Sequence, residues 1–222
     1  MINLKEIVKK MFEADKYKKK SLIVEHLSNI GYHTKFQKFK EGENILAEKK
    51  GFSKNKIIIS THYDGVGAYD NSGGVVVLMD LSKKIRNYNL KNSVQIIFFD
   101  QEEIGQKGSK YFLNSLNKKE ISKIIYNLNL DGVGVGSCIV SSDQFDVDKS
   151  ITDSTTFLEK GIPSKSYFTI SKRDKHILEK GIIPDFANKI HTLEDNPEII
   201  EEKSLKVASK NLFDLIKKEI KI

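Results

Sequence analysis

The feature that most constrains the fold is a set of three apolar segments that each lead directly into a His or a carboxylate. "KIIIST" (56–61), "SVQIIFFD" (93–100) and "KIIYNLNLD" (123–131) have the length of strands, and helix-like segments at 71–85 and 107–116 separate them. Apolar strands that alternate with helices are typical of a parallel sheet covered on both faces. The sequence therefore predicts an α/β fold: a three-layer α/β/α sandwich with a mostly parallel mixed sheet.

The flanking segments extend this pattern at both ends. Apolar positions spaced as on helix faces over residues 2–30 predict two helices or one broken helix. At the other end, Asn196 can cap a closing helix over 196–220, with Pro197 at its first position. Further strands are expected at 32–39, 44–50, 137–142 and 164–170, and a further helix at 154–161, where a glycine ends it.

The composition indicates a soluble globular protein with a single domain over residues 1–222. The chain has 222 residues, of which 39% are hydrophobic and 30% charged, enough for one substantial core. No apolar run approaches the roughly 18 residues that cross a bilayer, and residues 1–20 lack the apolar region of a secretory signal. Cys138 is the only cysteine, which leaves no internal disulfide. We therefore expect a cytoplasmic protein with no membrane partner.

The basic charge does not by itself indicate a nucleic-acid partner. The formal net charge is +7, but Arg86 and Arg173 are the only arginines. Base recognition and bidentate phosphate binding favour arginine, and the lysines are scattered over predicted helix faces and loops. We expect a lysine-rich solvated surface and no nucleic-acid partner. His26, His33 and His176 match no motif, and we expect them at the surface as well.

Acidic and imidazole side chains follow three successive strands of the predicted sheet. The carboxyl ends of parallel strands meet at one edge, where ligands of such sheets commonly bind. Taken alone, Asp70 before Asn-Ser-Gly-Gly is also typical of a helix cap, and Asp64 of an ordinary turn. It is the ordered set that indicates a site, namely His62, Asp64 and Asp70, then Asp100, Glu102 and Glu103, then Asp131.

A divalent cation would resolve the repulsion among these carboxylates. Carboxylates are seldom buried unless they are paired or bind a metal, and several held together repel one another. A mixed set of His and carboxylate ligands suits zinc, with cobalt or manganese as substitutes, and suits calcium poorly. The later segment "NKIHTLED" supplies His191, which makes the set large enough for two metals. Of the pair Glu102 and Glu103, one can bind metal while the other acts as a general base.

The order of the motifs resembles that of the co-catalytic zinc aminopeptidases of the aminopeptidase Y and aminopeptidase S type. The resemblance covers about residues 44–220 and rests on "STHYD", "AYDNSGG", "FFDQEEIGQKGS", "NLDGVG", "TDSTTFLEKGIP" and "IHTLED". It implies that two zinc ions are bound by His62, Asp70, Glu103, Asp131 and His191.

The resemblance also implies a role for each of these residues. Asp70 would bridge the metals, with His62 and Asp131 completing one site and Glu103 and His191 completing the other. Glu102 would be the general base, and Asp64 would orient the imidazole of His62.

The chain departs from the family pattern in three places. His62 and Asp70 are only eight positions apart, a shorter loop than the family has. Ser154 stands in "TDSTTF" where the family often has His, and no Tyr before it matches the one that stabilises the oxyanion in the family. The shape of the pocket and the oxyanion-stabilising group are therefore not predicted from the resemblance.

The resemblance implies a metal-dependent exopeptidase, and most directly a di-zinc aminopeptidase acting on short peptides. A carboxypeptidase or deacylase on the same fold stays open. A glutaminyl cyclase with a single zinc is a second alternative, although the presence of both His62 and Asp131 favours two metals and the chain has no Trp for an aromatic cyclase pocket. A binding protein without catalysis is a third, but it would be expected to have lost ligands.

Overall fold

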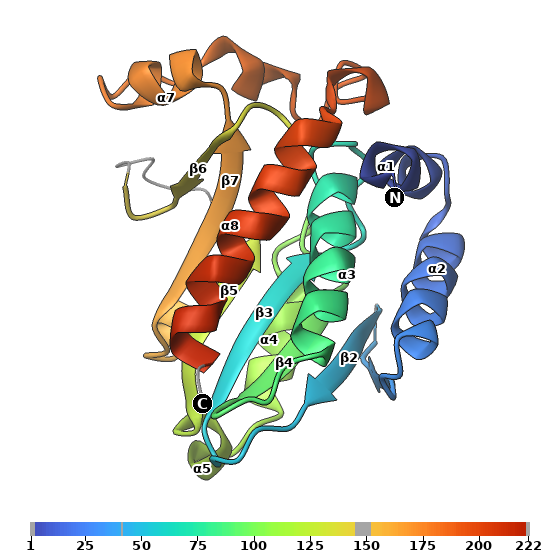
Figure 1. The fold of residues 1–222 in the computed structure, drawn as a ribbon, viewed down its shortest axis with the longest axis vertical. Coiled ribbons are helices and arrows are strands. Elements are labelled where there is room, and N and C mark those ends of the chain that lie inside the picture. Colours follow the sequence, from blue (N-terminus) through green and yellow to red (C-terminus); the bar gives the residue numbers. More distant parts are fainter. Residues whose placement is uncertain (1–2, 41, 145–151, 221–222) are drawn as a thin grey trace.

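The computed structural model describes residues 3–40, 42–144 and 152–220, so the predicted domain limits at 1 and 222 lie outside it. Within these ranges the chain forms one seven-stranded sheet with helices on both faces (Figure 1). The strands are β1 (Lys35–Lys38), β2 (Glu43–Lys49), β3 (Lys56–His62), β4 (Ser93–Phe99), β5 (Ile124–Leu130), β6 (Cys138–Ser141) and β7 (Ser164–Ile170). The helices are α1 (Leu4–Phe12), α2 (Lys16–Asn29), α3 (Ser72–Arg86), α4 (Lys107–Asn114), α5 (Lys118–Ile121), α6 (Asp153–Glu159), α7 (Lys172–Leu178) and α8 (Glu202–Ile220), with 3-10 helices η1 (Asp185–Lys189) and η2 (Pro197–Ile199).

The sheet is mixed, and its parallel part lies in the centre. The strand order is β1-β2-β4-β3-β5-β7-β6, in which the pairs of β3 with β4, β3 with β5 and β5 with β7 are parallel. The two edges are antiparallel, through β1 with β2 and β2 with β4 on one side and β6 with β7 on the other. The predicted α/β fold with a mixed sheet is confirmed, and β3, β4 and β5, which lead into the acidic segments, belong to its parallel part.

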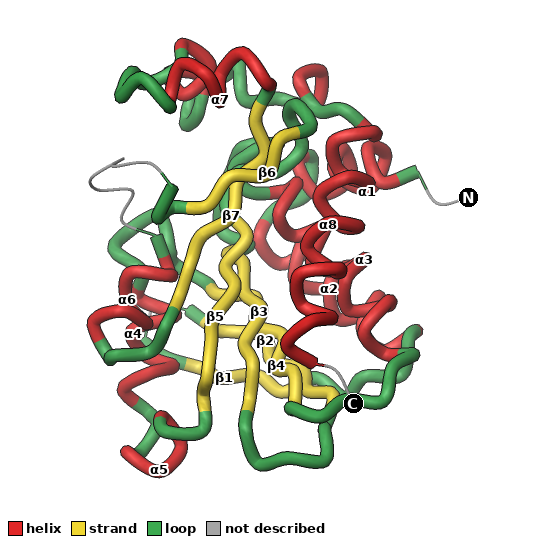
Figure 2. The backbone as a smooth tube through the Cα atoms, turned by 60° about the vertical axis from the view of Figure 1, so that its left-hand side comes forward, coloured by secondary structure: helices red, strands yellow, loops and turns green. Residues whose placement is uncertain are grey.

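Helices cover both faces of the sheet, as Figure 2 shows. The larger core lies on the face covered by α1, α2, α3 and α8. The smaller core lies under α4 and α6 and is built around Phe99, Phe112 and Phe157. β3 and β4 contribute to both cores, because Ile57 and Ile59 face one and Ile58 faces the other. This explains why these strands are apolar at nearly every position.

The start of α3 is fixed by contacts that only small residues permit. A Cβ added at Gly73 would lie 1.7 Å from the carbonyl oxygen of Val133. The backbone of α3 therefore packs directly against the backbone at Val133, and any larger side chain at position 73 would clash. Asn71 caps α3 by accepting the N–H of Gly74 at 3.1 Å, and its side-chain amide donates to Thr61 Oγ1 at 2.8 Å. Asp70 is therefore held between the end of β3 and the first turn of α3.

The closing helix begins later than the sequence predicts. Asn196 caps as expected, but it caps the single 3-10 turn η2, and α8 begins only at Glu202. Ile200 is extended between them, and the N–H of Glu201 donates to the carbonyl oxygen of Gly134 at 2.8 Å. This tertiary hydrogen bond takes a donor that a continuous helix would have used internally.

Two further differences concern polar segments. The apolar pattern of the sequence does not predict α7, because this helix buries no side chain. Ser171 nevertheless caps it by accepting the N–H of Asp174. His26 is half-buried rather than a surface residue, since its Nε2 lies 2.8 Å from the carbonyl oxygen of Met79. His33 is exposed, as expected, and the His176 side chain is 67% exposed.

None of the helices in the described ranges is long and apolar enough to cross a lipid bilayer. Cys138 is a free thiol.

Candidate metal centre

The carboxyl ends of β3, β4 and β5 bring the predicted residues together at one edge of the sheet. The strands are adjacent and parallel, so residues that follow them converge, and a fourth segment after η1 adds His191. Among the described residues, three overlapping groups of potential ligand atoms lie within 4.8 Å of one another. They are His62 with Asp70 and Asp131, His62 with Glu102 and Glu103, and Asp70 with Glu103 and His191.

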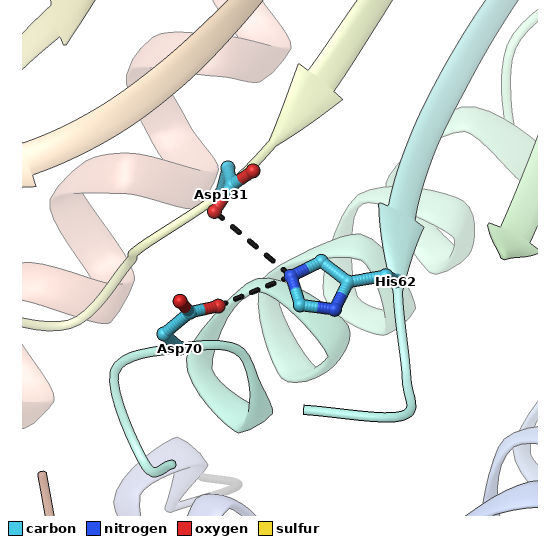
Figure 3. Close-up of side chains that lie close together, drawn as sticks. All are labelled: His62, Asp70 and Asp131. Atoms are coloured by element: carbon cyan, nitrogen blue, oxygen red, sulfur yellow. Dashed lines mark ion pairs between the residues drawn. The ribbon is translucent and has the colours of Figure 1, made fainter. Parts of the chain in front are cut away.

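One ring nitrogen of His62 faces the carboxylates of both Asp70 and Asp131, as Figure 3 shows. Its Nε2 is 3.1 Å from Oδ1 of Asp70 and 3.9 Å from Oδ1 of Asp131. The imidazole comes from the last residue of β3 and is 1% exposed, while Asp131 follows the end of β5 directly. Both are placed by buried strands, whereas Asp70 comes from the loop between β3 and α3.

The second group shares Asp70 with the first. The other carboxylate oxygen of Asp70, Oδ2, is 3.0 Å from Nε2 of His191. Nδ1 of His191 is in turn 3.5 Å from Oε2 of Glu103. His191 has a φ of 64°, in the left-handed region, and its side chain is 60% exposed. This group is therefore open to solvent on the side of the His191 loop.

Asp64 and Glu102 lie beside the two groups in different ways. Oδ1 of Asp64 is 3.3 Å from Nδ1 of His62, and its Oδ2 accepts the N–H of Glu103 at 3.4 Å. Asp64 thus contacts the ring nitrogen that points away from Asp70. Glu102 is 8% exposed, and burial together with Asp131, Asp153 and Asp70 raises its pKa to about 8.

The donor set fits a divalent cation. Nε2 of His62 and Oδ1 of Asp70 are buried, face each other at 3.1 Å and have no hydrogen-bond partner. Burial lowers the pKa of His62, but the carboxylates of Asp131, Asp64 and Asp70 outweigh it and hold this pKa well above its ordinary value. Buried atoms of this kind are costly when unpaired, and a cation would satisfy them together. Imidazole and carboxylate together are the ligands of zinc.

Asp100 is the one strand-end carboxylate that does not join the cluster. It is fully buried, forms an ion pair with Lys16 at 2.9 Å and accepts the N–H of Glu43 at 3.0 Å. Its negative charge is therefore compensated by α2.

Asp195 is a functional candidate that the sequence reasoning missed. Its carboxylate accepts the N–H of Tyr69 at 2.6 Å and the N–H of Asp70 at 3.1 Å. A Cβ added at Gly67 would lie 2.0 Å from Oδ2 of Asp195, so this glycine makes room for the contact. The only sequence signal is the position of Asp195 four residues after His191 in "HTLED". These hydrogen bonds connect the loop that carries His191 to the loop that carries Asp70.

Lys19 is a second residue without a sequence signal. It lies on α2, is 6% exposed and donates from Nζ to the carbonyl oxygen of Gly65 at 2.5 Å. Burial lowers its pKa, while the charges of Asp64 and Glu103 raise it. Lysines of α2 are spaced as on any solvated helix, which is why nothing in the sequence set this one apart.

Ser154 belongs to a buried hydroxyl network. Its Oγ lies 2.9 Å from that of Ser166 and 2.8 Å from Oγ1 of Thr152. Ser166 in turn accepts from the side-chain amide of Asn129 on β5. The network lies at the base of α6 and takes up the hydrogen-bonding capacity of Ser154.

An apolar cavity of about 260 Å³ is lined by the residues that directly precede two of the candidate ligands, Tyr69 before Asp70 and Ile190 before His191. The rings of Tyr69 and Phe186 meet edge to face with centroids 5.4 Å apart. Further lining comes from Phe168, Ile170 and Ile183. The size and lining suit one apolar side chain.

Comparison with known proteins identifies a family and several individual proteins that are similar to this chain. Residues 44–146 match the model of peptidase family M28. The leucine aminopeptidase 2 of Trichophyton rubrum is 35% identical over 96 residues, which cover 41% of this chain and 19% of that protein. The matched stretch therefore spans about a fifth of the length of this curated relative.

Two solved structures share the fold at low sequence identity. The zinc aminopeptidase BSAP from Bacillus subtilis superposes with a TM-score of 0.69 at 22% identity, covering 81% of this chain and 50% of that one. The glutaminyl cyclase of Porphyromonas gingivalis superposes with a TM-score of 0.77 at 17% identity, covering 98% of both chains. Residues 44–146 are therefore similar to peptidase family M28, and the fold of the chain is similar to that of zinc exopeptidases.

Proposed function

We propose that this protein is a metal-dependent exopeptidase, and specifically a di-zinc aminopeptidase that hydrolyses short peptides. The observation that carries the proposal is the position of Asp70. One of its carboxylate oxygens faces His62 at 3.1 Å and the other faces His191 at 3.0 Å, so it lies between two sets of potential ligands. Asp131 completes the first set and Glu103 the second. A shared carboxylate of this kind suits two cations held close together.

In this proposal Glu102 transfers the proton and Asp64 positions the imidazole of His62. Bound divalent ions would supply a Lewis acid for the scissile carbonyl and ease the deprotonation of water. Glu102 would take the proton from the attacking water and pass it to the leaving amine. Its low exposure and its position beside His62 and Glu103 support this role, because a general base must lie within reach of the proton that it abstracts. Asp64 would hold the His62 ring through Nδ1.

The surroundings of the cluster favour an apolar residue at the amino terminus of the substrate. The cavity beside Tyr69 and Ile190 would take its side chain, while the carboxylates that border the site would attract a protonated amine. The similarity to a leucine aminopeptidase supports the same choice.

A glutaminyl cyclase-like acyltransferase is the second candidate, and one specific observation supports it. The solved chain of the bacterial cyclase matches this chain over 98% of both lengths, with a TM-score of 0.77. A cyclase with a single zinc would not require both sets around Asp70 to bind metal. The number of zinc ions bound per chain therefore separates the two candidates.

The experiment is to assay purified, zinc-loaded protein against a panel of unblocked, amino-blocked and glutaminyl peptides, with elemental analysis of the same sample. We expect release of apolar amino-terminal residues, loss after chelation, recovery with zinc, and two zinc ions per chain. Cleavage of blocked peptides would indicate a carboxypeptidase or deacylase. Cyclisation with one zinc would support the alternative. A fully loaded sample that is inactive on the whole panel would contradict all of these activities.

A further inference from the structure

Within the described ranges, one edge of the sheet has a short unpaired stretch, residues 47–49 of β2, which we call the notch. It lies at the opposite end of the sheet from the metal cluster. β1 pairs with β2 only over Glu43–Leu46, while β2 continues to Lys49. On its other side β2 pairs with β4 up to Lys49. In the part of the chain that the structure describes, no strand pairs with the outer edge of residues 47–49. This short stretch of open strand edge can therefore still accept a partner strand.

The notch opens into a cavity of about 600 Å³. The lining includes Ala47, Glu48 and Lys49 from the open edge of β2. A second cavity of about 680 Å³ shares Leu46 and Glu48 and lies toward α4 and α5. The end of β2 therefore lies between two cavities, and the space beside its backbone is not filled by side chains.

The notch is far from the proposed catalytic edge. Lys56 lines both cavities and begins β3, whereas His62 ends the same strand. At about 3.3 Å per residue the two residues are about 20 Å apart along the strand. A partner at the notch would leave the metal cluster uncovered.

The two cavities hold most of the excess positive charge of the chain. Six lysines and one arginine line them, against the two carboxylates of Glu48 and Glu120. The formal net charge of the whole chain is +7. Both glutamates are already engaged, because Glu48 pairs with Lys56 at 3.2 Å and Glu120 accepts the N–H of Asn117 at 2.8 Å. The lysines are thus concentrated around the open edge to a degree that the sequence did not reveal.

Arg86 is held in position at the wall of the notch. Its Nε donates to the carbonyl oxygen of Ile30 at 3.3 Å, and its guanidinium lies 5.7 Å from the ring centre of Tyr32. Such anchoring lowers the entropic cost of presenting the charge to a partner.

We propose that this notch binds an extended acidic segment of another protein, which adds as a strand to the open edge of β2. Main-chain hydrogen bonds from residues 47–49 would supply the geometry. The surrounding lysines, including Lys35 and Lys49, would select carboxylates at alternate positions of the added strand.

The charge pattern favours this occupant over two others. Lysines beside an edge strand prevent pairing with a like-charged chain, so a second copy of this protein is repelled by the same residues that attract an acidic strand. A single-stranded nucleic acid would need exposed aromatic rings for base stacking. The aromatic residues that line the two cavities, Tyr32 and Phe112, are only 5% and 2% exposed.

The test is fluorescence anisotropy with a blocked, labelled peptide of alternating Glu and Val. We expect saturable binding that weakens at least about tenfold in the double variant Lys35→Glu, Lys49→Glu, since each lost attraction becomes a repulsion. A matched control is Lys160→Glu, Lys210→Glu, which changes two exposed lysines outside both cavities and should bind as the wild type does. Peptidase activity and circular dichroism should be unchanged in both variants.

A second arm distinguishes strand addition from simple charge attraction. The same peptide with N-methyl groups along one hydrogen-bonding edge keeps its charge but cannot extend the sheet, and we expect it to lose binding. Hydrogen exchange in segment 47–49 should slow only with the unmethylated peptide. Equal binding of the methylated peptide, of polyphosphate or of single-stranded RNA would overturn the proposal, as would the absence of any peptide binding.

Discussion

The carboxylate of Asp195 accepts the backbone N–H of Asp70 at 3.1 Å across 125 positions of the chain. Asp195 also accepts the N–H of Tyr69, and the N–H of Ala68 donates to the carbonyl oxygen of Asp195 at 3.1 Å. The two loops that carry Asp70 and His191 are therefore one hydrogen-bonded unit. The separation of the two candidate ligands depends on a residue that contacts neither imidazole.

The change Asp195→Asn tests this unit. The amide would place an N–H group against a backbone N–H, so one buried donor would be left unpaired at a cost of about 1–3 kcal/mol in unfolding free energy. Zinc affinity should fall by roughly 10- to 100-fold because the support of Asp70 is lost. Competition with a chromogenic chelator measures this. Glu194→Gln, at the exposed neighbour, is the matched control, and equal zinc affinity in both variants would remove Asp195 from the site.

The adjacent residues Glu102 and Glu103 should respond differently to the same substitution. Glu102→Gln is expected to retain zinc and to lose roughly 10²- to 10⁴-fold in kcat, because only proton transfer is removed. Glu103→Gln is expected to lower the zinc content, since Glu103 lies beside His191. Elemental analysis alongside steady-state kinetics separates the two effects. Full activity in Glu102→Gln would show that another group accepts the proton.

Lys19→Met tests the contribution of α2 to the loop between His62 and Asp70. The methionine removes the hydrogen bond to the carbonyl oxygen of Gly65 and the cation near Asp64. We expect a loss of about 1–3 kcal/mol in unfolding free energy, in the range of a hydrogen bond from a charged donor. Urea unfolding of the zinc-free protein measures it. Lys18→Met, one position earlier and exposed, should have a much smaller effect.

Ala187→Phe tests the apolar cavity beside Tyr69 and Ile190. The larger side chain should fill much of the 260 Å³ and exclude bulky side chains of the substrate. We expect kcat/KM to fall by about 10- to 100-fold for peptides that begin with Leu, and to change little for those that begin with Ala. If both peptides are affected equally, the substrate side chain binds elsewhere.

His26 should make the stability of the protein depend on pH. Burial lowers its pKa, even though the carbonyl oxygen of Met79 accepts from the ring, so the folded state holds it neutral. An unfolded His binds a proton below its ordinary pKa of about 6.5. The contribution of His26 is therefore fully present above that pH and is lost as the pH falls toward the lower folded-state pKa.

The change His26→Gln should make the unfolding free energy fall less steeply as the pH is lowered, by at most about 1.4 kcal/mol per pH unit. The free energy of unfolding in urea, measured from about pH 8 down to about pH 5 for both proteins, gives the comparison. The residues of the metal cluster titrate in the wild type and in the variant, so their contribution to the unfolding free energy cancels in the difference. Parallel pH profiles would show that His26 is not the group responsible.

The sequence predicted the strands that carry the site because burial on both faces leaves a strong local signal. β3, β4 and β5 are apolar along their length and the polar residues follow them directly, so their meeting at one edge was predictable. The seven predicted site residues do meet there, although their roles stay predictions. Asp195 and Lys19 left no comparable signal, because each acts through hydrogen bonds to distant backbone atoms. The late start of α8 likewise left no local signal, because it depends on the hydrogen bond from the N–H of Glu201 to the distant carbonyl oxygen of Gly134.

The unequal exposure of the two imidazoles has a consequence for how long each cation would stay bound. His62 is 1% exposed beneath strand ends, whereas the His191 side chain is 60% exposed on a loop. In a two-zinc enzyme, the ion held with His62 would have a long residence time and the ion held with His191 would exchange quickly with the medium. The inner ion would then act as a permanent part of the fold, and the supply of the outer ion would set the fraction of active molecules.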